Sequence, residues 1–173
     1  MPIATLLVTG CGFSPDTAPR PIEIDEVSVV TSVPGGDIAA QTTDMWFVDG
    51  SVLVSVEASV ADLAPATVLG ALIGGGAARP SGLRSAIPPA TELLGVALDG
   101  SVAIVDLSSA FTLVGGDEEI RAVGQVVLTL TALDGITGVR LFIDGNPVAA
   151  PVGEGELVDR PLTADDFSGP IGS

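Results

Sequence analysis

The chain has 173 residues, enough for one domain with a terminal extension. Its 22 acidic residues, six arginines and absent lysines give a formal net charge of −16, which excludes binding to nucleic-acid phosphates or anionic lipid headgroups by charge. Hydrophobic residues make up 47% and aromatic residues only 3%, so the core is expected to be aliphatic. Histidine is absent, and with it the commonest general base and metal ligand.

Residues 1–11 predict a lipoprotein export signal that looks truncated at its start. A short apolar run ends at Val8-Thr9-Gly10-Cys11, and small residues before a cysteine resemble the lipobox, whose cysteine thiol receives a diacylglyceryl group. The apolar run is short and no basic residue precedes it, so we expect the true start to lie upstream. Cys11 is therefore the predicted lipidation site and membrane anchor. A free thiol near the chain end is the alternative.

Residues 12–43 predict a flexible linker, because Pro, Ser, Thr, Gly and Asp dominate the segment. A strand hairpin follows at residues 44–48 and 51–58, joined by Asp49-Gly50, a pair typical of tight hairpin turns. Residues 64–73 predict a short helix that has a proline in its first turn and ends at three glycines.

Residues 77–90 predict a loop, and residues 92–98 and 101–107 a second hairpin, turned by Asp99-Gly100. The next segment, 117–133, is ambiguous on local evidence. Its β-branched run favours a strand, whereas Asp117 as a cap, acidic residues in the first turn and apolar spacings of three and four favour a helix. The length and the acidic start lead us to predict the helix.

Residues 138–144 predict a final strand that ends in an Asp-Gly turn. Residues 153–173 predict a C-terminal tail, a short strand or loop followed by disorder, in which Asp165-Asp166 is solvated. The order ββαββαβ indicates an α+β fold, an antiparallel-rich mixed sheet with two helices packed on one face. The domain is expected to span residues 44–152.

Several separated blocks of residues follow one another in a distinctive order along the chain. They are Leu83-Arg84-Ser85-Ala86-Ile87-Pro88, Thr91, Leu94-Gly95-Val96, Val105-Asp106-Leu107-Ser108 with Phe111, Gln125 with Thr129-Leu130-Thr131, and residues 139–143 with Asp144-Gly145. Together these blocks resemble the GerMN domain. This domain is known from sporulation and spore-germination proteins and from actinobacterial envelope lipoproteins. The resemblance covers about 100 residues, 44–146, and implies a small αβ domain outside the cytoplasmic membrane with a role in protein assembly. The spore protein has two such domains and the actinobacterial proteins continue into a β-rich domain, so neither specific role transfers.

No catalytic, metal or cofactor-binding residues are predicted. The four Asp-Gly pairs lack the ligand spacing of a calcium loop and are interpreted as turns. Glu118 and Glu119 are adjacent on a helix and point about 100° apart, so they are not an acid–base pair. The serines have no His or Lys to activate them. Arg84 and Arg140 are the candidate partner contacts, since a guanidinium binds a carboxylate through two hydrogen bonds.

The sequence therefore predicts a non-enzymatic lipoprotein at the extracytoplasmic face of the cell membrane, anchored through Cys11, whose domain binds another envelope protein. The alternative is a lipid-anchored protein that binds a ligand or metal through its acidic clusters. A carboxylate-only hydrolase is a third hypothesis, although no spacing places a pair of carboxylates for it.

Overall fold

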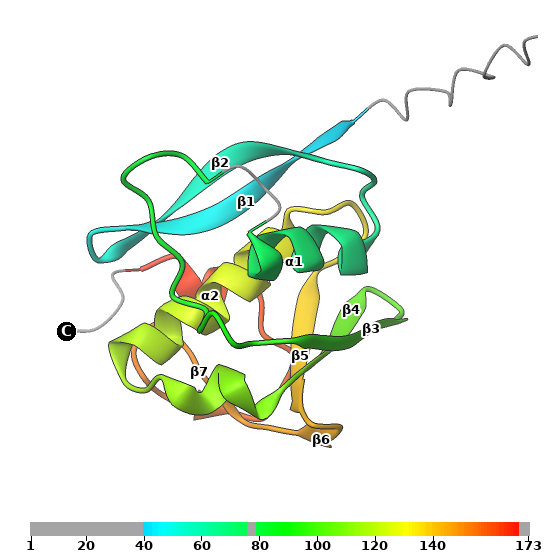
Figure 1. The fold of residues 1–173 in the computed structure, drawn as a ribbon. Helices are drawn as coiled ribbons and strands as arrows, with labels where there is room; N and C mark the ends of the chain where they lie inside the picture. The colour runs from blue at the N-terminus through cyan, green and yellow to red at the C-terminus, as the bar shows by residue number, and fades with distance from the viewer. Residues whose placement is uncertain (1–39, 76–78, 170–173) are drawn as a thin grey trace, which may run out of the picture. The chain divides into compact units, whose positions relative to one another are not determined.

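A computed structural model describes residues 40–75 and 79–169, which form an α+β domain (Figure 1). The predicted export signal, Cys11 and most of the linker lie outside the described residues. The elements are β1 (Gln41–Asp49), β2 (Val52–Val60), α1 (Pro65–Gly74), β3 (Leu93–Asp99), β4 (Val102–Leu107), η1 (Ser109–Leu113), α2 (Asp117–Thr131), β5 (Gly138–Ile143), β6 (Asn146–Pro147), β7 (Ala150–Pro151), β8 (Leu157–Val158) and η2 (Ala164–Phe167). The α+β class and the predicted order of the main elements are confirmed.

Tight turns occur at the three hairpins where Asp-Gly pairs predicted them, but Asp49 and Asp99 are the last paired residues of β1 and β3, so the two-residue loops there are 50–51 and 100–101. Gly50 and Gly100 have φ values of 58° and 59°, and Asp144 and Gly145 have values of 48° and 78°. Positive φ at both central residues is the geometry that matches the twist of a two-residue hairpin. The β5–β6 hairpin has this geometry, at Asp144 and Gly145.

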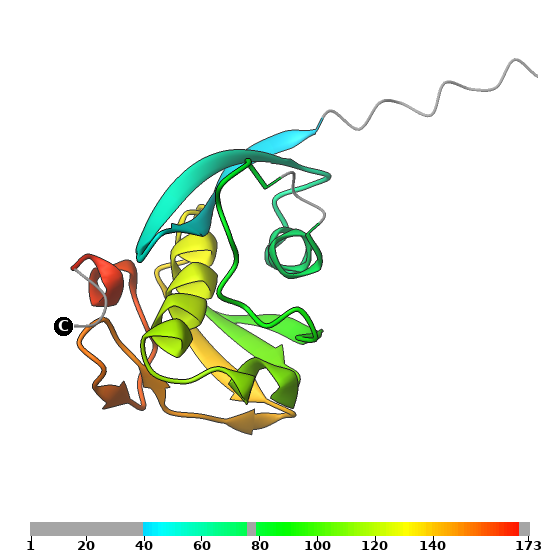
Figure 2. The same cartoon turned by 60° about the vertical axis from the view of Figure 1, so that its left-hand side comes forward.

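The strands of the described residues form three separate sheets, not the single sheet that the sequence predicted. β1 and β2 form one sheet, β3-β4-β5-β6 a second with β4 and β5 parallel, and β7-β8 a third. Both helices contact the same face of the four-stranded sheet, as expected, but the β1–β2 hairpin covers them from the other side (Figure 2). Helix α2 is thereby enclosed between two β layers, and its residues 120–130 are all buried. Apolar side chains of α2 pack in the core, whereas Arg121, Gln125 and Thr129 hydrogen-bond to the hairpin.

Helix α2 begins one residue earlier than predicted, with Gly116 and not Asp117 at the cap position. Gly116 has φ 62° and ψ −140°, a conformation open to glycine, and no side chain caps the helix. Asp117, Glu118 and Glu119 occupy the first turn, where carboxylates interact favourably with the helix dipole. The predicted acidic start is correct and only the cap differs.

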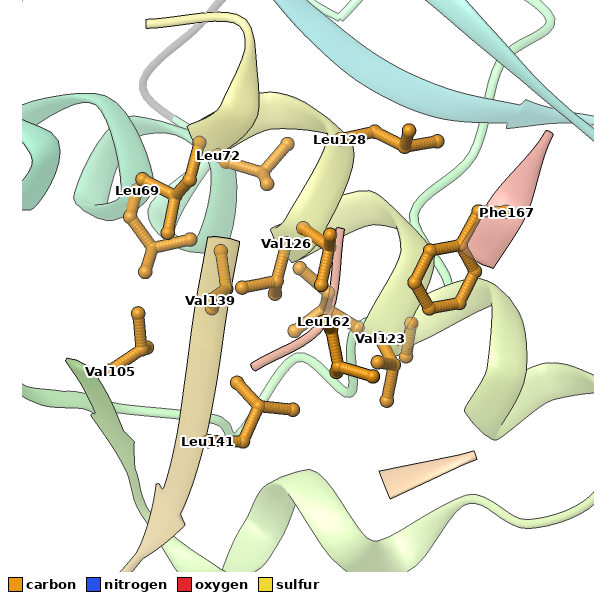
Figure 3. Close-up of a cluster of buried hydrophobic side chains, with 14 of the residues drawn as sticks. Leu69, Leu72, Val105, Val123, Val126, Leu128, Val139, Leu141, Leu162 and Phe167 are labelled. Atoms are coloured by element: carbon orange, nitrogen blue, oxygen red, sulfur yellow. The ribbon is translucent and has the colours of Figure 1, made fainter. Parts of the chain in front are cut away.

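The C-terminal segment is folded against the domain up to the last described residues, which corrects the prediction of a loose tail. Leu162 is 1% exposed and forms a bridge with Val139 of β5, and Phe167 is 5% exposed against α2 (Figure 3). Asp166, predicted to be solvated, closes a capping box with Thr163 and pairs with Arg160. Residues 41–43, predicted as linker, also belong to β1. The buried Thr43 faces the core on the same side of the strand as Met45.

Candidate interaction surface

Two buried polar side chains of α2, Gln125 and Thr129, hydrogen-bond to the edge of β1 that does not pair with β2. The Trp46 N–H donates to Thr129 Oγ1 at 3.0 Å, and Gln125 Nε2 donates to the Trp46 carbonyl at 2.8 Å. Gln125 Oε1 also accepts the backbone N–H of Ala86. Gln125 and Thr129 are both 0% exposed and lie one helical turn apart, so they face the same side.

Residues 83–88, one of the blocks that resemble the GerMN domain, are held in place by these and neighbouring hydrogen bonds. Arg84 and Val48 exchange two backbone hydrogen bonds of 2.8 and 2.9 Å. The backbone N–H of Ala86 donates to Gln125 Oε1. Two of the blocks named in the sequence, residues 83–88 and Gln125 with Thr129, thus meet in one buried network. Their role there is structural, since buried backbone groups need partners. The sequence signal was a Gln and a Thr spaced by four within an apolar helix face.

Arg84, one of the two predicted partner contacts, is paired within the domain. Its guanidinium donates to both oxygens of Glu118, and Arg121 approaches the same carboxylate at 3.4 Å. The hydrogen bond from Arg84 holds the pKa of Glu118 below its ordinary value, with a smaller contribution from Arg121. An acidic group of a partner would have to compete with Glu118 for Arg84.

Arg140, the other predicted contact, lies on the face of the four-stranded sheet that the helices do not cover. The register places it beside Ile104, and the two line an open depression of about 430 Å³ with Phe142 and Pro161. No side chain of the described residues forms an ion pair with Arg140. Its guanidinium is therefore available beside half-buried apolar side chains.

Strand β3 forms one edge of the same sheet. Within the described residues it pairs with β4 alone, and Leu94 and Leu98 are 49% and 56% exposed. β3 has no proline, and its one charged residue is the terminal Asp99. A β-bulge between Leu93 and Gly95 interrupts the start of the strand, so residues 95–98 form its regular open edge. The Arg140 depression reaches this edge at Asp99, the last residue of β3 (Figure 1). Leu98 pairs with the buried Ala103, so its side chain lies on the opposite face of the sheet from Arg140, and the two flank the same edge.

The other candidate residues do not assemble a reactive site. Ser85 Oγ accepts the backbone N–H of Ile87, and Ser108 Oγ accepts that of Glu92, so both hydroxyls hold loops. In the part of the chain that the structure describes, no three His, Cys, Asp or Glu side chains are grouped to hold a metal ion. None of the described helices has the length and apolarity to cross a membrane.

Comparison with known proteins identifies the family. Residues 44–149 match the family model Germane, described as sporulation and spore germination. The chain belongs to the Germane family. The resemblance seen in the sequence is thereby confirmed.

Solved structures of Germane domains share the fold. The first GerMN domain of the sporulation protein GerM from Bacillus subtilis is 25% identical, with a TM-score of 0.60, and the match covers 72% of this chain and 98% of that one. The tandem GerMN domains of the same protein match at 23% identity and a TM-score of 0.58, covering 74% of this chain and 48% of that one.

A provisionally assigned lipoprotein from Clostridium perfringens shares the fold at 20% identity and a TM-score of 0.51, covering 73% of this chain and 90% of that one. No curated protein matches the chain. The family assignment therefore comes from the Germane model, and the GerM domains show the shared fold.

Proposed function

We propose that this Germane-family chain is a non-enzymatic lipoprotein, anchored through Cys11 at the extracytoplasmic face of the cell membrane, whose domain binds another envelope protein. The observation that supports binding is the edge of β3 at residues 95–98, which pairs with no other described strand beyond β4 and lies beside the Arg140 depression. An extended segment of a partner can add to such an edge through backbone hydrogen bonds. Arg140 would then receive a carboxylate of that partner through two hydrogen bonds.

The anchor is supported by the lipobox-like sequence that ends at Cys11. Two acyl chains anchor a protein stably, whereas a single chain binds reversibly. The test is Cys11→Ala followed by fractionation of source cells. We expect the variant to move from the membrane to the soluble fraction, and full retention in the membrane would contradict the anchor.

The binding surface is tested by placing a photo-crosslinking amino acid at Leu98 in source cells. Leu63 is the matched control position, because it is also an exposed leucine, at 40%, but lies between β2 and α1. We expect a discrete adduct at position 98 that is absent at 63 and is weakened by Arg140→Glu. Equal crosslinking at both positions, or none at 98, would contradict the proposal.

Cation binding is the alternative function. Asp44, Glu57 and Asp134 line one depression of about 280 Å³ and make it acidic, although these three described carboxylates are not grouped closely enough to form a ready-made metal site. Calorimetric titration with Ca²⁺ separates the two functions. Saturable micromolar binding that is lost in Asp134→Asn would favour the alternative, and its absence favours the protein-binding role.

A further inference from the structure

A second hollow of the domain has apolar walls and one charged residue. It has a volume of about 200 Å³ and lies between η1, α2, β5 and the segment around β7. Four of its lining residues are at most 4% exposed: Phe111, Val123, Leu141 and Ala150. Val123 and Leu141 come from α2 and β5, on facing sides of the core (Figure 3). Val148 and the exposed Ala149 form part of the rim.

Glu119 is the charged member of this lining. It lies in the first turn of α2 and is half-buried, and its carboxylate forms no hydrogen bond or ion pair with any described residue. The adjacent Glu118, by contrast, is held by both Arg84 and Arg121. The hollow thus presents one carboxylate without a cationic partner next to an apolar slot.

We propose that this hollow receives a lysine side chain of a partner protein. A lysine has a stem of four methylene groups that packs on apolar surface and a cationic head that stays near polar groups. The stem would lie against Val123 and Leu141, and the ammonium group would donate to the Glu119 carboxylate. The ammonium replaces the absent partner of Glu119 within the hollow.

Size and charge both favour this occupant. A volume of about 200 Å³ is below the roughly 300–1,000 Å³ of sites for drug-sized ligands, and suits a single anchoring side chain. The net charge of −16 attracts basic partners and opposes the approach of a second copy of the chain. The residues of the hollow differ from those of the β3 edge and the Arg140 depression, so this proposal can fail or succeed independently of the proposed function.

The test is a nuclear magnetic resonance titration of the full chain with two blocked pentapeptides, Gly-Gly-Lys-Gly-Gly and its norleucine counterpart. Norleucine has a similar apolar stem and lacks the ammonium group. We expect saturable shifts of the amide signals of Val123, Leu141 and Val148 with the lysine peptide, and binding at least fivefold weaker with norleucine.

The matched pair of variants is Glu119→Gln and Glu92→Gln, since Glu92 is an exposed carboxylate outside the hollow. Glu119→Gln should weaken binding of the lysine peptide by about five- to tenfold, because one charged hydrogen bond that is partly exposed to solvent is lost. The affinity for the norleucine peptide should stay unchanged. Glu92→Gln should change neither affinity.

A second variant, Ala149→Trp, places a large ring at the rim and should abolish binding of both peptides while the remaining spectrum stays dispersed. Equal affinity for lysine and norleucine, an unchanged lysine affinity in Glu119→Gln, or shifts confined to other parts of the domain would overturn the proposal.

Discussion

Gln125 shows how one side chain can organise segments that lie far apart in the sequence. It is fully buried and bonds to the backbone of Trp46 in β1 and of Ala86 in the loop before β3. Each of these backbone groups would otherwise be buried without a partner, which costs about 1–3 kcal/mol. The amide of Gln125 therefore joins three parts of the core.

Replacing Gln125 with Leu should lower the free energy of unfolding by about 2–4 kcal/mol, because the Trp46 carbonyl and the Ala86 N–H both lose their partner. Urea denaturation measures the change. Gln41→Leu, at the exposed start of β1, is the control and should stay within about 0.5 kcal/mol of the parent. A similar small loss for Gln125→Leu would contradict this role.

Asp166 makes the C-terminal segment sensitive to acid. The hydrogen bond from Arg160, aided by the backbone N–H of Thr163, lowers the pKa of Asp166 from 3.8 to about 2. A folded-state pKa below the unfolded value adds stability above pH 3.8, which is lost as the pH falls from 3.8 towards 2.

The comparison of Asp166→Asn with the parent chain tests this coupling. The parent should be the more stable protein at pH 7, and the difference in free energy of unfolding should shrink below pH 4 and vanish near pH 2. Urea denaturation across this range checks it, with Asp165→Asn as the control for loss of one exposed charge. A difference that is independent of pH would rule the coupling out.

At the scale of elements, glycine is closely packed in α2 but not in α1. A Cβ on Gly124 of α2 would lie 2.7 Å from Leu53 Cδ1 and 3.0 Å from Phe167 Cδ1, whereas a Cβ on Gly70 of α1 would meet nothing within 4 Å. Gly124 thus allows β2 and the C-terminal segment to approach α2 closely. Gly70 has no such contact.

Gly70→Ala should raise the free energy of unfolding by about 0.5–1 kcal/mol, because alanine favours the helix. Gly124→Ala offers the same helical gain but should lower the free energy by about 1–2 kcal/mol, since the ring of Phe167 must move. Thermal unfolding of both variants measures the signs. Stabilisation by Gly124→Ala would show that Leu53 and Phe167 adapt at little cost.

Helix α2 also shows where local patterns were sufficient. Its acidic first turn and its apolar spacings outweighed the β-branched run near its end, and the structure has a helix from Asp117 to Thr131. Val126 and Val127 are both 0% exposed. The packing of β-branched residues on every side of α2 offsets their weaker helix propensity.

For the whole molecule, repulsion among like charges should outweigh the ion pairs. The chain carries −16, and the described residues contain only a few partly exposed ion pairs, which contribute little. Added NaCl at pH 7 should therefore raise the midpoint of thermal unfolding, because screening relieves the repulsion. At about pH 4.1, the isoelectric point, the same salt should have little effect. A fall in the midpoint with salt at pH 7 would show that the ion pairs dominate.

Much of the candidate surface required the structure. Arg84 and Arg140 were equally plausible contacts from sequence, and only the fold shows that Glu118, 34 residues away from Arg84, engages one of them. The hollow beside Glu119 was not predicted, because its walls come from segments that are distant along the chain. The spacing of residues in the sequence indicates which side chains are neighbours within one helix or strand. It contains little information about which helices and strands pack together.

The sequence alone determined the helices, the main strands, the Asp-Gly turns and the family, since each depends on local periodicity, on residues that accept positive φ, or on ordered blocks of letters. Only the tertiary structure decided that the strands divide into separate sheets, that the β1–β2 hairpin covers the helices, and that the segment ending at Phe167 joins the core. The physical reason is that an apolar face requires burial but does not specify which other face will cover it. That choice depends on close packing of the whole domain.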